Sequence, residues 1–419
     1  MNDECLKTEQ RKKFETKNQH YVPQFYFRFF SNDKKTINLF NIEKGIYKLK
    51  IPISSQCSED YFYGSDGAVE KMLGKLEAEF RILFGKLNKV ESTESLPRQQ
   101  RKNNKISVLF TKDDLLLLRL FAVVQYTRTK NMQLLIDEIV QDTLRVALKH
   151  EGNSLPEDLL KRISLQKGVN VAMFHAAIGF PLLLDLKVSF LVNENKTDFI
   201  LGDNPIVLFN PLMEKFNIKA TMGIASRGLI IFFPVSAKLM VCLYDENAYK
   251  FEKEIITLNN SKEIDEINAM QMLISRKNVY FTRNEMTEEY FRNLLLQYPR
   301  VEKKHVQSET LADFPNEVVH AHIKGLEYSF KFRFFKIKSE AVKKMYEAIK
   351  GIGIEKQGPF CRDERLVCLL KQFMEKVKNG MCEVDGLNDF LREQMFEDKT
   401  MREKKRNFIY SVKNLYGSF

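Results

Sequence analysis

The stretch Gln-His-Tyr-Val-Pro-Gln-Phe-Tyr-Phe-Arg-Phe-Phe, residues 19–30, places a histidine directly before a short and strongly aromatic segment. Proline is favoured at the first position of a helix, because the N–H that it lacks has no partner there, so Pro23 predicts a short helix. His20 is then expected just outside the helix N-terminus, beside unpaired amides and the positive end of the dipole. That position favours neutral imidazole, which can act as a base or bind a metal. It equally suits a ring that only fills a gap and makes one hydrogen bond.

Composition is that of a globular chain with a substantial core. The chain has 419 residues, of which 44% are hydrophobic, enough for two or three domains or for one large domain with an extension. The formal net charge is +11, from 66 basic and 55 acidic residues. A basic surface favours a polyanionic partner such as nucleic acid, but the basic residues are spread along the chain without a long block.

The cysteines and the apolar runs indicate in which cellular compartment the protein is expected. The six cysteines contain no Cys-x-x-Cys pair and match no zinc or disulfide spacing, which is typical of a reduced setting. The first twenty residues are charged and polar, unlike a signal peptide. The longest apolar run, 115–124, contains Arg119 and is well short of the ~20 residues that cross a bilayer. We therefore expect a cytoplasmic protein with no membrane contact.

Hydrophobic periodicity predicts an α+β chain of mixed helices with antiparallel strands and hairpins. Residues 36–40 and 45–49 alternate around a Glu-Lys-Gly turn and predict a hairpin, and 66–89 carry a helical stripe. A long helix is predicted from Asp113 to about His150, with Thr111 or Asp113 as its cap. Further helices are predicted at 157–180 and 262–275, and strands at 187–192, 198–201, 229–233, 237–244 and 278–282. We expect an α+β core domain at 1–300 and a mostly helical C-terminal module at 301–419.

The opening motif resembles the start of the domain-of-unknown-function 4238 family, which has a His-Tyr-x-Pro…Tyr-Leu-Arg…Phe pattern. The matching residues here are His20, Tyr21, Pro23, Tyr26, Arg28 and Phe30, with Phe27 where the family usually has leucine. More of the family's pattern follows in order over roughly residues 18 to 285. The later residues of the pattern are Glu77 and a Gln-x-x-Arg-Thr run that contains Gln125, Arg128 and Thr129. Two further segments are Asp203-Asn204-Pro205 and Phe233-Pro234-Val235-Ser236. The resemblance implies a shared site, without a named reaction.

Two polar residues continue the apolar face of the predicted long helix. Gln125 and Arg128 are three positions apart, so both project to the same side. They must find partners, because an unpaired buried polar group costs about 1–3 kcal/mol and a buried charge costs more. A carboxylate in a bidentate pair is the natural partner of Arg128, and Glu77 or Asp203 can supply it.

Asp203 and Asn204 follow the predicted strand that ends at Leu201. Binding and catalytic residues often lie on loops at strand ends. Asp and Asn before proline also make ordinary turns, because their side chains bond their own backbone and proline keeps the preceding residue extended. Both interpretations of these two residues stay open.

Six residues therefore form one predicted site: His20, Glu77, Gln125, Arg128, Asp203 and Asn204. The set suits hydrolysis, with His20 as general base or metal ligand and Arg128 stabilising developing negative charge. Glu77 and Asp203 would act as bases or as further ligands of Mg²⁺ or Mn²⁺. The chain has no Gly-rich phosphate loop, no Gly-x-Ser-x-Gly elbow and no His-Glu-x-x-His.

The leading functional hypothesis is a metal-dependent nuclease that acts as an effector in bacterial defence or in a toxin system. The alternative is a non-catalytic binding or scaffold protein, in which the polar set is a structural hydrogen-bond network. In that case the helical C-terminal module would dock a protein partner. Sensing of a small ligand at the same place, without turnover, is a third hypothesis.

Overall fold

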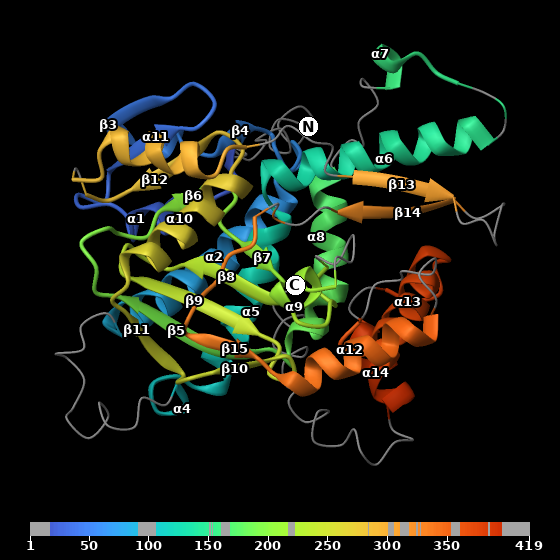
Figure 1. Cartoon of the computed structure of the whole chain (residues 1–419). Helices are drawn as coiled ribbons and strands as arrows, with labels where there is room; N and C mark the ends of the chain where they lie inside the picture. The colour runs from blue at the N-terminus through green and yellow to red at the C-terminus, as the bar shows by residue number, and fades with distance from the viewer. Residues whose placement is uncertain are drawn as a thin grey trace, which may run out of the picture.

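Helices pack against several small and medium β-sheets in the computed structural model of the chain (Figure 1). Helices and strands contribute to the same buried cores, which confirms the predicted α+β class. The residues that the structure describes are 17–90, 106–150, 152, 154–160, 168–216, 223–283, 285–300, 306–310, 318–323, 326, 328–352, 361–383 and 386–395.

The opening motif begins with a strand and continues into the predicted short helix. Strand β1 (Asn18–His20) pairs antiparallel with β4 (Ser58–Asp60). Helix α1 (Gln24–Arg28) follows, and Pro23 lies just before its first residue as the N-cap. The predicted hairpin is confirmed as β2 (Thr36–Asn41) and β3 (Ile46–Pro52), and a 3₁₀ turn, η1 (Ile53–Ser55), leads towards β4.

Two larger sheets form the centre of the fold. The first is antiparallel and has the order β3-β2-β12-β6, and the second has the order β11-β5-β9-β8-β7 with one parallel pair, β11 and β5. Strands β8 and β9 are buried at every position, because both faces of their sheet are covered. The strands not yet bounded are β5 (Lys187–Asn193), β6 (Leu201–Gly202), β7 (Val207–Phe209), β8 (Ile230–Pro234), β9 (Leu239–Tyr244), β11 (Ile255–Leu258) and β12 (Asn278–Phe281).

The predicted long helix at 113–150 is wrong as one continuous element. It is two helices, α5 (Lys112–Thr127) and α6 (Lys130–His150), with Arg128 as the C-cap of the first. The side chains of Arg128 and Thr129 at the break bind residues of other segments, so tertiary contacts fix the interruption. Thr111 caps α5 in a reciprocal box with Asp114, as one of the two predicted caps.

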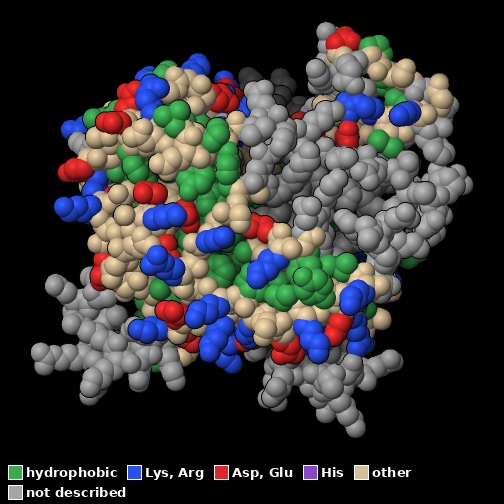
Figure 2. Space-filling view, in the orientation of Figure 1, with side chains coloured by type: hydrophobic (Ala, Val, Ile, Leu, Met, Phe, Trp, Pro, Cys, Tyr) green, Lys and Arg blue, Asp and Glu red, His purple; other side chains and the backbone are tan. Residues whose placement is uncertain are grey.

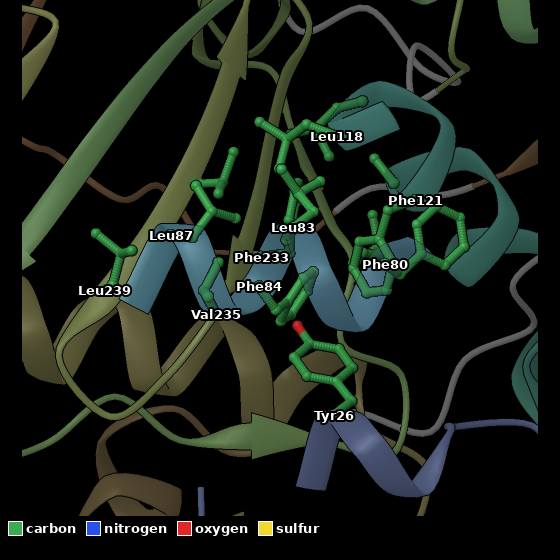
Figure 3. Close-up of a cluster of buried hydrophobic side chains, with 14 of the residues drawn as sticks. Tyr26, Phe80, Leu83, Phe84, Leu87, Leu118, Phe121, Phe233, Val235 and Leu239 are labelled. Atoms are coloured by element: carbon green, nitrogen blue, oxygen red, sulfur yellow. The ribbon is translucent and has the colours of Figure 1, made fainter. Parts of the chain in front are cut away.

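The core beside the opening motif is an aromatic cluster built from three helices and one strand turn. Figure 3 shows side chains of α1, α5 and α2 (Ala68–Leu87) directed towards Phe233, Val235 and Leu239. The Tyr26 ring lies 5.2 Å from Phe84 and 5.3 Å from Phe121 between ring centroids, both edge-on. Its hydroxyl donates to the Pro234 carbonyl, so this buried polar atom has a partner.

Further helices complete the part of the fold before residue 300. The predicted helix at 157–180 is seen at its two ends, as α7 (Glu157–Leu160) and α8 (Gly168–Gly179), and residues 161–167 lie outside the described part. The predicted helix and strand at 262–282 are confirmed as α10 (Ser261–Ile274) and β12. The other elements here are η2 (Asn88–Val90), α4 (Ile106–Leu109), η4 (Phe180–Leu183), α9 (Pro211–Glu214) and α11 (Glu288–Gln297).

Among the described residues after 300, strands come first and the helices begin at Ser339. Strands β13 (Val306–Thr310) and β14 (Val318–Ile323) pair with each other, and β15 (Phe335–Ile337) pairs with β10 (Tyr249–Phe251) of the preceding chain. The helices are α12 (Ser339–Ile352), α13 (Glu364–Lys378) and α14 (Leu387–Met395). None of the helices in the described ranges combines the length and apolar composition needed to cross a bilayer.

The last two helices are docked on the core through apolar and charged contacts. Buried side chains of α13 and α14 pack on α8 and η4. The Arg362 side chain, 4% exposed, places its Nε 2.9 Å from the Asp185 carboxylate and donates to the carbonyls of Leu182, Ile224 and Ser226. This part of the predicted module is therefore fixed to the core by a buried arginine.

Candidate functional site

Arg128 is the centre of the polar residues around the opening motif. Its guanidinium is buried, with Nη2 at 2.8 Å from Glu77 Oε1 and at 2.7 Å from the His20 carbonyl oxygen. Its Nε donates to the Tyr63 hydroxyl at 3.1 Å. Of the two carboxylates predicted as its partner, Glu77 is the one that binds. The predicted bidentate pair is wrong, because Nε is taken by Tyr63 and a single N–O contact joins the ions.

Burial and the neighbouring side chains have opposite effects on the pKa of Arg128. Burial alone would lower the pKa of the guanidinium, but Tyr63 and Glu77 raise it, and the net result is a pKa above the ordinary value. Arg128 is therefore a permanent cation in the protein interior. The Glu77 side chain is 28% exposed and lies at the border of the core and the solvent.

The main chain of the opening motif is held by side chains from other segments. Gln125 Nε2 donates to the Tyr21 carbonyl at 3.0 Å, and the Tyr63 hydroxyl donates to the His20 carbonyl at 3.1 Å. Gln19 accepts from the Tyr63 backbone amide at 2.6 Å. We call Gln19, Tyr63, Glu77, Gln125 and Arg128 the motif network. Most polar side-chain atoms of these residues form hydrogen bonds with one another or with the backbone.

The His20 ring lies at the outer side of this network. Its Nε2 is 3.2 Å from the Ser54 carbonyl oxygen and 3.3 Å from Gln24 Nε2. Burial lowers the pKa of the His20 imidazole, and the bond to Ser54 and the charge of Glu77 only partly offset this effect. The ring is half-buried, and the neutral form is favoured, as the sequence predicts.

Asp203 holds a turn that is distant in the sequence. Its Oδ1 accepts from the backbone amide of Arg276 at 2.7 Å, and its Oδ2 accepts from the amides of Lys277 and Asn278 at 2.8 and 3.0 Å. Burial raises the pKa of this carboxyl, and the three amides lower it in part. The sequence suggested that Asp203 and Asn204 make a turn with their own backbone. Asp203 instead stabilises the distant turn between α10 and β12.

Asn204 connects that turn to the end of α5. Its Nδ2 donates to the Ile274 carbonyl at 3.2 Å, and its Oδ1 accepts from the Thr129 hydroxyl at 3.3 Å. Thr129 follows Arg128 directly in the chain. Asp203 and Asn204 therefore adjoin the motif network through Thr129.

The six predicted residues form two adjoining groups with different partners. His20, Glu77, Gln125 and Arg128 meet around the opening motif, whereas Asp203 and Asn204 bind the segment 274–278. The charge of Glu77 raises the pKa of the His20 imidazole and that of Arg128 lowers it, whereas the charge of Arg300 lowers the pKa of Asp203. The hydrogen bonds thus place the six residues in two groups that adjoin at Thr129, and a shared site stays a prediction.

The predicted metal ligands are not gathered as a metal site. Among the residues that the structure describes, no three His, Cys, Asp or Glu side chains are placed to hold an ion. Glu77 Oε1 binds Arg128, and both oxygens of Asp203 accept from backbone amides. His20, Glu77 and Asp203 thus do not fit the Mg²⁺ or Mn²⁺ that we expected them to bind.

Sequence reasoning missed Tyr63, which binds His20 and Arg128, and Cys57, which lies near Asp203. Tyr63 follows no periodic pattern, so nothing in the sequence distinguished it from an ordinary core tyrosine. Cys57 has a positive φ of 49° and a buried thiol 3.4 Å from the Tyr280 hydroxyl. Burial raises the pKa of this thiol, so it is not a reactive thiolate. The charge of Asp203 acts on Cys57 and on Tyr21, and the cluster therefore links Asp203 to the opening motif.

Comparison with known proteins identifies the family. The family described as protein of unknown function (DUF4238) matches residues 18–285, more than half of the chain, and the chain belongs to this family. The matched range contains both groups of polar residues and the two central sheets. No curated protein and no solved structure matches the chain.

Proposed function

We propose that this chain is a non-catalytic binding protein in which the polar motif residues of the family hold the fold together. The observation that carries the proposal is that the predicted site residues make hydrogen bonds to main-chain atoms. Gln125 and Arg128 donate to main-chain carbonyls of the opening motif, and Asn204 donates to the Ile274 carbonyl. Asp203 accepts from three main-chain amides.

Burial supports the same conclusion. Gln125 and Arg128 are each 1% exposed, and Asp203 and Asn204 are each 6% exposed. A catalytic group must be able to approach the atom on which it acts, within about 2.6–3.2 Å or through one water. Side chains that are enclosed and already bonded to the backbone are better suited to stabilising a fold, because each unpaired group would cost about 1–3 kcal/mol.

The charge pattern of the displayed face lacks the basic patch expected of a nucleic-acid interface. Figure 2 shows Lys and Arg side chains interspersed with Asp and Glu over the face that it displays. Recognition of nucleic acid is typically accompanied by basic residues clustered on one face or stripe. On the displayed face the basic side chains are therefore mixed with acidic ones and not gathered in one patch.

The proposal includes a protein partner that meets the C-terminal helices. The apolar faces of α13 and α14 pack against the chain's own core. Tyr346 of α12 is 57% exposed and packs edge-on against Phe216, with 4.8 Å between ring centroids. Exposed aromatic side chains of this kind are common anchors of protein interfaces.

A hydrolase is the second candidate function, because His20 is half-buried and its neutral form is favoured. Neutral imidazole is the form of histidine that acts as a general base. The Glu77 carboxylate is close enough to act on the pKa of His20 and would orient the charged form. The predicted role as a nuclease in bacterial defence or in a toxin system depends on this one side chain.

One experiment separates the two functions. Purified full chain and its His20→Ala variant are incubated with RNA and with DNA, in Mg²⁺, in Mn²⁺ and in EDTA. The binding proposal predicts no cleavage by wild type above that of the variant. Cleavage by wild type that His20→Ala abolishes would overturn it in favour of the hydrolase. Asn18→Ala, an exposed position on the same strand, is the matched control for effects on folding.

A further inference from the structure

A pair of histidines lies in the hairpin that follows the two central sheets in the chain. His320 and His322 belong to strand β14 and are separated by one alanine. Successive residues of a strand alternate between its two faces, so these two histidines share one face. They come after residue 285 and are therefore outside the range that the family matches.

The register of the hairpin adds a carboxylate residue to the same face. Strand β13 pairs antiparallel with β14, so that Glu309 lies opposite His320 and Gln307 lies opposite His322. Residues directly opposite in an antiparallel pair share a face, with their Cβ atoms about 4.5–5.5 Å apart. Residues two apart along one strand are separated by about 7 Å. Glu309, His320 and His322 therefore occupy three neighbouring positions on one face.

The other face of the hairpin has a different composition. Its opposed pairs are Val306 with Ile323 and Ser308 with Ala321. One polar and one mostly apolar face is the usual pattern of an antiparallel pair that packs on one side only. Figure 1 shows β13 and β14 beside α6, which the hairpin contacts. The alternation of the strands thus separates the histidines and the glutamate from the apolar residues.

The residue types of the polar face suit a transition metal. The structure describes these strands through their backbone, and their side chains are not among the described side chains, in which no metal-binding trio occurs. Imidazole suits zinc, copper, iron and nickel, whereas magnesium and calcium prefer oxygen ligands. Two histidines and one glutamate are a ligand set that proteins use for zinc, with water in the fourth position.

We propose that Glu309, His320 and His322 bind a zinc ion on this face of the hairpin. The three residues come from neighbouring positions of two paired strands, so one ion would join β13 to β14. Gln307 holds the remaining position of the face, opposite His322. Its amide oxygen is a harder ligand than imidazole, so the fourth coordination position is left to water. The site is separate from the motif network and does not depend on the proposed function.

Titration calorimetry of the full chain with zinc chloride tests the site. The chain is first freed of metal with EDTA, kept reduced, and compared in a second titration with magnesium chloride. The expected result is one zinc ion per chain and an at least hundredfold weaker affinity for magnesium. The absence of saturable zinc binding would overturn the proposal.

X-ray absorption of the zinc-loaded chain identifies the ligand atoms. The six cysteines are the competing zinc ligands of this chain, because thiolate sulfur binds zinc well. The proposal predicts nitrogen and oxygen neighbours without sulfur. A zinc ion with sulfur neighbours would show that cysteines hold it and would overturn the hairpin site.

Matched variants locate the ion. His320→Asn and His322→Asn each remove one imidazole from the hairpin, and His175→Asn makes the same change in α8. Zinc affinity should fall at least tenfold in each hairpin variant and stay within twofold of wild type in His175→Asn. Equal affinity in the three variants would overturn the site.

A variant with higher affinity separates the loss of a ligand from the loss of the fold. Gln307→His places a third imidazole opposite His322 on the same face. Four protein ligands close the tetrahedral shell that zinc prefers, so the affinity should rise at least tenfold. An affinity equal to or below that of wild type would contradict the shared face and the site built on it.

Discussion

Replacing Arg128 with methionine should be among the most damaging single changes in the chain. The substitution keeps an apolar stem but removes the donors that bind the His20 carbonyl and the Tyr63 hydroxyl. Breaking a buried ion pair by removing one partner costs about 3–5 kcal/mol. Glu77 keeps some hydration because it is 28% exposed, so most of the cost comes from the two uncharged partners, at about 1–3 kcal/mol each. We expect a loss of about 3–4 kcal/mol.

The assay is urea unfolding followed by far-UV circular dichroism, since the chain contains no tryptophan for fluorescence. Arg81→Met is the control, because Arg81 is an exposed arginine on α2. Its effect should stay within about 0.5 kcal/mol, as is usual for surface positions. A loss below about 1 kcal/mol in Arg128→Met, with an unchanged urea dependence, would refute the claim that Arg128 holds the opening motif.

Three further changes test other parts of the structure. Asp203→Asn should cost about 2–4 kcal/mol in urea unfolding, because the new amide presents donors towards backbone amides that need an acceptor; an unchanged midpoint would contradict this role. His20 has a lowered pKa in the folded state, so the unfolded chain takes up its proton first as the pH falls below about 6.5. Wild type should therefore lose more stability between pH 7.5 and pH 5 than His20→Asn does, and equal slopes in unfolding titrations would disprove this. Arg362→Ala should increase hydrogen exchange in α13 and α14 selectively, and uniform exchange would show that Arg362 does not anchor these helices.

Local sequence patterns predicted the elements whose signals are local. The aromatic helix after Pro23, the hairpin at 36–52 and the helix α2 each follow from residues that are close in the chain. The hairpin turn even contains the glycine that it needs, since Gly45 has a φ of +62°. These elements were predictable because capping, turn and periodicity rules act over a few residues.

Elements fixed by distant contacts were not predictable in the same way. The break between α5 and α6 comes from side chains that bind other segments, although the sequence there is compatible with one helix. Strand β15 pairs with β10, more than eighty residues earlier, and the short strand of residues 249–251 carries little pattern of its own. Pairing at that distance depends on the complete fold.

The candidate site shows the same division. Spacing predicted that Gln125 and Arg128 share a side of their helix and that Arg128 needs a carboxylate, and Glu77 is that partner. Spacing could not show that Asp203 would bind the turn at 276–278 or that Tyr63 would lie between His20 and Arg128. Those arrangements depend on which segments meet. In the structure the side chains of Gln125, Arg128, Asp203 and Asn204 bind main-chain atoms of other segments.

A double-mutant cycle between Arg128→Met and Tyr63→Phe tests most directly whether the motif residues act as a structural network. The two side chains are buried and 3.1 Å apart, from Nε to the hydroxyl oxygen. Free energies of unfolding in urea for wild type, the two single variants and the double variant give the coupling between them. The account predicts a coupling of about 1 kcal/mol or more. Additive losses, with a coupling below about 0.3 kcal/mol, would contradict it.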